Sequence, residues 1–249
     1  MAAVSDFCRA IDAAGIRDRF YRLNLFAGTG LNAALVPLYR GPTYGGTDYG
    51  NATDTNNGPF VSGDYTETGA SGGLLGDGSG KYLDTGLTVA TVGLAGHHAF
   101  YHDRTGSKTG SKSLGGATNG ARTQRFTNFS PNGIDSLTAT FGGTRIANDN
   151  GISPGFNLTT RRTDTDLEHY IDGSSADTNV LAATASDIAI NFGVFATIGL
   201  SDTNAVDNAF GYWNDRIKGY SFGLDMTATQ ASDYYTAMQA FQTALGRNA

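Results

Sequence analysis

The chain has 249 residues, a formal net charge of −6 at pH 7 and only 16% charged residues. Without a basic stripe, this charge argues against nucleic acid as a partner and against binding to acidic membranes. Glycine is abundant, with 35 residues, and the only two glutamates are Glu67 and Glu168, which indicates many turns and few long helices. The length fits one large domain.

The first forty residues predict a helix, a strand and a second short helix. Apolar residues at helical spacing predict a helix from about Ala3 to Ala14, which Gly15 ends. Cys8, the single cysteine, excludes an internal disulfide, and its place on the apolar face predicts that it is buried. Alternation over residues 21–25 predicts a half-buried strand, and residues 31–38 form the second helix.

The N-terminus shows no signal-peptide pattern, and no apolar run reaches membrane-spanning length. We therefore expect no membrane insertion. If the protein acts outside the cell, we expect it to arrive by a route that the N-terminus does not show, such as lysis.

Residues 41–80 are rich in Gly, Asn, Asp and Thr and predict a long ordered loop region with one or two short strands. Strand patterns then recur through residues 81–224. The clearest runs from Ile188 to Leu200, with seven apolar residues at period two. The pattern predicts one long strand. Two alternatives stay open, namely a bend or bulge at Gly193 or Gly199 and a turn that splits the segment.

The C-terminal region predicts a strand over residues 213–224 followed by a helix from Thr227 to Leu245. Thr227 and Gln230 have the spacing of a capping box, and an apolar stripe follows it. Many short antiparallel strands with a helix at each end predict a mainly β protein, an antiparallel β-sandwich. We expect a single domain over residues 1–249, closed by a helical segment at 225–249.

Four stretches resemble the concanavalin A-like lectin/glucanase class, including its laminin-G-like members, as found in tailed-phage virions and on bacterial surfaces. They are residues 15–41, 73–86, 168–173 and the closing strand and helix. The resemblance implies a jelly-roll sandwich that serves in adhesion or display, such as a phage structural, decoration or appendage protein. Its implied partners are a glycan or other virion or surface proteins, and we expect a homo-oligomer.

Carbohydrate binding needs an aromatic ring beside side chains that hydrogen-bond to hydroxyl groups. One stretch offers this chemistry, namely Tyr212, Trp213, Asn214 and Asp215. A second candidate contact surface is the loop that begins with His102, Asp103 and Arg104 and runs through to Lys112. Packing in the core is the competing interpretation for the single Trp.

For the glucanase branch of this class, the resemblance implies a catalytic pattern in which two Glu residues flank an Asp on one face of a strand. Asp164, Asp166 and Glu168 imitate that spacing, but Asp replaces Glu at the first position and the run leads into a turn. A solvated strand face is the simplest interpretation, and a calcium site is an alternative, because hard oxygens suit Ca²⁺. His97, His98 and His102 are too far apart on a strand to share one zinc.

We therefore predict a non-enzymatic display or binding domain without a cofactor, with calcium as the one exception to test. Two alternatives stay open. The first is a glycoside hydrolase or lyase of the same fold, and the second is a purely structural, self-assembling subunit.

Overall fold

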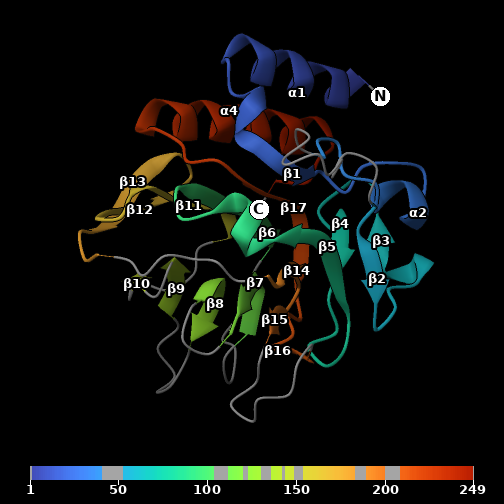
Figure 1. Ribbon diagram of the computed structural model, residues 1–249. Coiled ribbons are helices and arrows are strands. Elements are labelled where there is room, and N and C mark those ends of the chain that lie inside the picture. Colours follow the sequence, from blue (N-terminus) through green and yellow to red (C-terminus); the bar gives the residue numbers. More distant parts are fainter. Residues whose placement is uncertain are drawn as a thin grey trace.

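The computed structural model describes residues 2–40, 53–103, 112–119, 123–129, 136–141, 144–148, 154–182, 189–199 and 208–248. Within them, two β-sheets stack face to face, and helices α1 and α4 cover the outer face of one sheet (Figure 1). This mainly β architecture with a helix at each end confirms the predicted fold class. None of the described helices is long and apolar enough to cross a membrane.

The helix-covered sheet has the strand order β13-β12-β11-β6-β17-β4-β3, and β1 also pairs with β17. All of these pairs are antiparallel. The strands are β1 (Phe20–Asn24), β3 (Tyr65–Thr66), β4 (Gly73–Leu75), β6 (Gly96–Asp103), β11 (Gly155–Thr163), β12 (Asp166–Ile171), β13 (Ser174–Asn179) and β17 (Arg216–Gly223).

The second sheet has the order β10-β9-β8-β7-β14-β5-β2. A short strand, β15, pairs in parallel with β7 and antiparallel with β16. The strands are β2 (Thr55–Asn57), β5 (Tyr82–Thr88), β7 (Lys112–Thr118), β8 (Thr123–Phe129), β9 (Ser136–Phe141), β10 (Thr144–Asn148), β14 (Asn191–Val194), β15 (Thr197–Gly199) and β16 (Asn208–Phe210).

The helices lie mainly at the ends of the chain. Their bounds are α1 (Ala2–Ala13), α2 (Leu31–Ala34), α3 (Val89–Val92) and α4 (Ala228–Ala244), and the described residues also form the 3₁₀ turns η1 (Arg17–Arg19) and η3 (Ser62–Asp64). The capping box of α4 is confirmed, because Thr227 accepts from Gln230 N and the Gln230 side chain accepts from Thr227 N. Gly15 adopts φ +67° after α1, which suits glycine at a helix end.

Alternation along the strands creates two apolar layers. On β6, Phe100 points between the sheets and meets Phe222, whereas Ala99 and Tyr101 face the helices. Between the sheets, Phe192 and Phe222 stack with ring centroids 4.4 Å apart. All five residues of β1 are buried, although its alternation predicted a half-buried strand, because the helix layer covers the second face.

Three expectations need correction. The apolar run 188–200 is not one long strand but is split by a turn: Phe195, at φ +70°, separates β14, which is antiparallel to β7, from β15, which is parallel to β7. Cys8 is half-buried and not enclosed, because the buried stripe of α1 centres on Phe7 and Ile11. The region 53–80 contains β2, β3 and β4, one strand more than the two expected for the longer segment.

Candidate functional site

The two stretches proposed for carbohydrate contact, 110 residues apart in sequence, converge at one end of the sandwich. The His102 and Trp213 rings meet edge to face, with centroids 5.7 Å apart. Asp103 lies opposite Arg216, where β6 pairs with β17. Arg104 lies outside the described residues. The fold therefore brings two separate sequence motifs next to each other.

Two members of that group are buried and unable to touch a surface ligand. Trp213 has no exposed surface, and its backbone carbonyl accepts a 3.1 Å hydrogen bond from Gly78 N. His102 is equally enclosed, and its Nε2 lies 3.0 Å from Asn157 Nδ2. The packing interpretation of Trp213 is therefore the correct one. A sugar cannot stack on Trp213, because the indole belongs to the buried core between the sheets and has no exposed surface.

A different aromatic ring stands beside Tyr212. The Tyr82 ring at the start of β5 lies 6.2 Å from it, tilted by 51°, and both residues are half-buried. Exposed Asn214, two residues after Tyr212, and half-buried Lys112 lie around Gly78. Lys112 precedes Ser113, which forms a β-bridge with Tyr212. We call these residues, namely Asp77, Gly78, Tyr82, Lys112, Tyr212 and Asn214, the Gly78 surface.

Tight turns hold the Gly78 surface in place. Asp77 Oδ1 accepts hydrogen bonds from three consecutive backbone N–H groups, those of Ser79, Gly80 and Lys81, at 2.9–3.1 Å. Partial burial raises the pKa of Asp77, but these three donors outweigh it and hold the pKa well below its ordinary value. The carboxylate is thus ionised at neutral pH and fixes the loop.

The 76–81 loop is anchored to the 211–215 segment by two backbone hydrogen bonds. Gly76 N donates to Asp215 O and Gly78 N donates to Trp213 O, both at 3.1 Å. Ser113 on β7 ties the same segment to the second sheet, because its N–H donates to Gly211 O. Sequence reasoning missed Tyr82 altogether. Its strand pattern was visible, but nothing local indicates that its ring meets Tyr212.

The acidic triplet is not assembled as a metal site. Asp164 lies in the turn between β11 and β12, and its backbone carbonyl accepts from Arg161. The Arg162 guanidinium binds Asp166 at 2.7 Å and Glu168 at 2.8 Å. A cation therefore already lies between the two carboxylates. No group of three or more metal-binding side chains occurs among the residues described by the structure.

Glu168 is further engaged by Ser175, whose hydroxyl donates a 2.6 Å hydrogen bond. Burial raises the pKa of Glu168, but the hydrogen bonds from Ser175 and Arg162 outweigh this effect, so the net shift of the pKa is downward. A general acid needs a raised pKa. The arrangement at Glu168 therefore gives the opposite of what acid catalysis requires.

The three histidines lie on opposite faces of β6, as the strand alternation predicted. His97 faces the helices, with its ring nitrogens 2.6 Å from Leu224 O and 2.8 Å from Ser221 Oγ. His98 faces the other sheet and packs on Phe192 and Phe222. Burial lowers the pKa of His97 to about 4, so it is neutral at pH 7.

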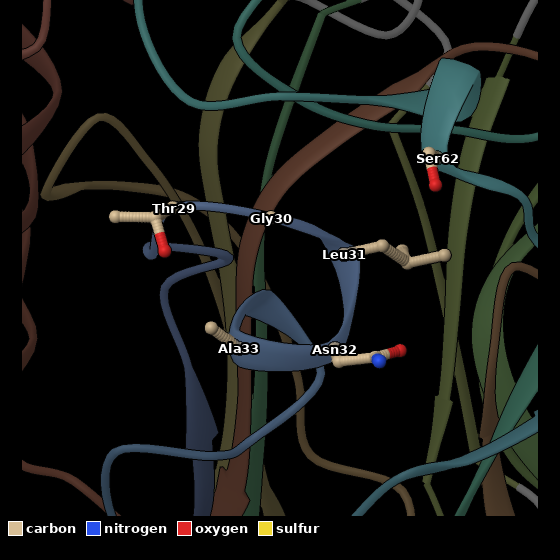
Figure 2. A pocket seen from close by; sticks show the side chains of 6 residues that line it. All are labelled: Thr29, Gly30, Leu31, Asn32, Ala33 and Ser62. Carbon is tan, nitrogen blue, oxygen red and sulfur yellow. The ribbon is translucent and has the colours of Figure 1, made fainter.

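A second candidate surface is a depression of about 370 Å³ beside α2. Figure 2 shows its lining, which is formed by Thr29, Gly30, Leu31, Asn32, Ala33 and Ser62. Thr29, Asn32 and Ser62 offer exposed polar side chains. The lining includes no aromatic ring, so it lacks the flat apolar face against which a sugar ring packs.

No protein-family model matches the sequence, and no curated protein matches it either. Several solved structures share its fold. Domain 4 of AbnA, a GH43 extracellular arabinanase from Geobacillus stearothermophilus in complex with arabinotriose, is 15% identical. The alignment covers 86% of this chain and 99% of that chain, with a TM-score of 0.52.

Two botulinum neurotoxin structures are also similar. One is of botulinum neurotoxin type C, whose cell entry depends on interaction with two ganglioside molecules. It is 10% identical to this chain, with a TM-score of 0.54. The other, the serotype D binding domain, is 8% identical with a TM-score of 0.50. The alignments cover 91% and 89% of this chain, which spans about half of each toxin chain, 53% and 52%.

These similarities, together with the two-sheet topology, show a concanavalin A-like jelly-roll sandwich. At such low identity they establish the fold alone. Function has to be argued from the side chains of this chain.

Proposed function

We propose that this chain is a non-catalytic carbohydrate-binding domain and that the Gly78 surface is its contact site. The observation that carries the proposal is the tilted pair of Tyr82 and Tyr212 beside exposed Asn214, all held by the hydrogen-bonded 76–81 and 211–215 segments. Half-buried tyrosines present ring faces and hydroxyl groups at little cost in side-chain entropy.

Preorganisation supports this role. A ligand that binds to fixed loops does not have to order them, so more of the contact energy appears as affinity. The Asp77 turn and the two backbone hydrogen bonds to residues 213 and 215 provide that rigidity. The matched arabinanase domain was solved with arabinotriose, and this makes a sugar the first ligand class to test.

The non-catalytic part of the proposal rests on the two glutamates of the sequence. Glu67 Oε1 accepts a hydrogen bond from Gly28 N, and Glu168 is paired with Arg162. A retaining glycosidase needs two carboxyl groups about 5 Å apart across the scissile bond. Both glutamates instead serve structural contacts.

The biological setting is part of the same proposal. The sequence resemblance to phage and bacterial-surface proteins suggests that the domain displays this site on a virion or a cell surface, as a single domain that forms homo-oligomers. Mass spectrometry of purified particles and light scattering of the purified chain test these two points.

The central experiment is a glycan-array screen of the full chain, followed by calorimetry with the best ligand. We expect Tyr212→Ala and Tyr82→Ala each to weaken binding at least tenfold, whereas Tyr212→Phe retains most of it. The control is the double variant Thr29→Ala, Asn32→Ala in the depression of Figure 2, which we expect to bind normally. Loss of binding in that control alone would move the site to α2, and the absence of any glycan ligand would refute the proposal.

A further inference from the structure

We infer that the sugar bound at the Gly78 surface carries a carboxylate and that Lys112 binds this group. The inference rests on the proposed function and adds the class of ligand. It distinguishes acidic sugars, such as uronic and sialic acids, from neutral ones.

The ammonium group of Lys112 uses only part of its hydrogen-bonding capacity. Lys112 is half-buried at the start of β7, and its Nζ donates one hydrogen bond, 3.0 Å long, to the carbonyl oxygen of Gly78. It forms no ion pair with any residue that the structure describes. An ammonium has three donors and a full charge, and a neutral carbonyl uses only one of them. A carboxylate satisfies the remaining donors and the charge together.

Gly78 brings a second donor next to this ammonium. A Cβ atom at position 78, where φ is +73°, would lie 2.7 Å from Asn214 Cβ and 3.6 Å from Lys112 Nζ. Only glycine permits this close approach of the two side chains. Asn214 is exposed, so its amide is available to donate a hydrogen bond to the same carboxylate that Lys112 attracts.

The nearest acid in the loop, Asp77, forms no ion pair with Lys112 among the residues that the structure describes. Asp77 directs Oδ1 to the backbone N–H groups of residues 79–81, which fixes it on its own turn. The other lysine of the loop, Lys81, is already paired with Asp64 at 2.6 Å. In a chain with a net charge of −6, Lys112 is thus a cation at Gly78, and its neighbour Ser113 pairs with Tyr212 of the aromatic pair.

Paired ligands test the inference directly. Trigalacturonic acid is compared with its methyl ester, and 3′-sialyllactose with lactose, by calorimetry on the full chain. We expect the acid of at least one pair to bind at least tenfold more tightly than its neutral form. We also expect its affinity to fall with added salt, because the interaction is between charges.

Variants assign the effect to Lys112. We expect Lys112→Met to bring the affinity for the acid down to that for the neutral form, and Lys112→Arg to keep most of the preference. Thermal melting checks that each variant is folded. Equal binding of acid and neutral forms, or a sulfated sugar preferred over both acids, would overturn the inference and leave the proposed function standing. If no sugar binds, the proposed function itself fails.

Discussion

Tyr220 Oη donates a 2.6 Å hydrogen bond to Oδ2 of Asp54, a carboxylate enclosed between the two sheets. Asn24 Nδ2 donates to the same oxygen at 3.1 Å. Burial raises the pKa of Asp54 to about 6, against the smaller lowering effects of Tyr220, Asn24 and the Arg22 guanidinium. Asp84 raises it slightly further. The segment before β2 is thus tied to β1 and β17 through an acid that is costly to ionise.

Asp54→Asn should therefore stabilise the protein at neutral pH. The folded-state pKa is higher than the unfolded one, so ionisation of Asp54 costs the folded state roughly 3 kcal/mol above pH 6 and nothing below pH 4. Asparagine keeps an acceptor for Tyr220 and Asn24 and removes this cost. We expect urea unfolding to show a gain of about 1–3 kcal/mol at pH 7.5 and little change at pH 4. A loss at pH 7.5 that disappears at pH 4 would instead show that the ionised carboxylate stabilises the fold.

The buried histidines should act in the opposite direction over the same pH range. Burial lowers the pKa of both His97 and His169 to about 4, below the unfolded value of 6.5. Their neutral forms stabilise the fold above pH 6.5, and this stability is lost as the pH falls toward 4. In the Asp54→Asn background, we expect the unfolding free energy to fall by several kcal/mol between pH 6.5 and 4, up to about 3 kcal/mol for each histidine. Imidazole NMR signals that titrate near pH 6.5 in the folded protein would contradict this.

Arg162 should make calcium unnecessary on β12. Its guanidinium pairs with both Asp166 and Glu168, whereas Asp164 contributes its carbonyl to a turn. We expect neither EDTA nor millimolar Ca²⁺ to change the melting temperature. Arg162→Met should lower the unfolding free energy by about 1 kcal/mol, since the pairs are partly exposed. A calcium-dependent rise in the melting temperature of the unmodified chain would restore the metal-site hypothesis.

Trp213 should report on the core and not on the ligand. It is the only tryptophan and is fully buried, so we expect blue-shifted emission with little quenching by iodide. Trp213→Ala should cost about 3–5 kcal/mol of stability, because it leaves a cavity between the sheets. A bound sugar should leave the emission of the unmodified chain nearly unchanged. Strong iodide quenching would show that the indole is accessible from the surface.

Local patterns in the sequence predicted much of the fold. The capping box at Thr227 and Gln230, the end of α1 at Gly15 and the strand alternation around Phe100 each depend on neighbours a few residues away. The sequence also singled out residues 102–103 and 212–215 as candidate contact residues, but it did not indicate that His102 and Trp213 are buried.

The composition of the Gly78 surface was decided only by the tertiary structure. Tyr82 meets Tyr212, and both Lys112 and Asn214 approach Gly78, through contacts between segments that are far apart in the chain. The same long-range packing buries Trp213 and His102, and it splits the apolar run at Phe195 so that β15 joins β7.

The sequence by itself determined which residues alternate, cap and turn, because those preferences arise from backbone geometry within a few residues. It also set the mainly β class. Whether an aromatic side chain is core or contact surface depends on what covers it from the opposite sheet. Whether a carboxylate meets a metal or a guanidinium depends on the strand register, which for Arg162, Asp166 and Glu168 is set by the pairing of β11 with β12.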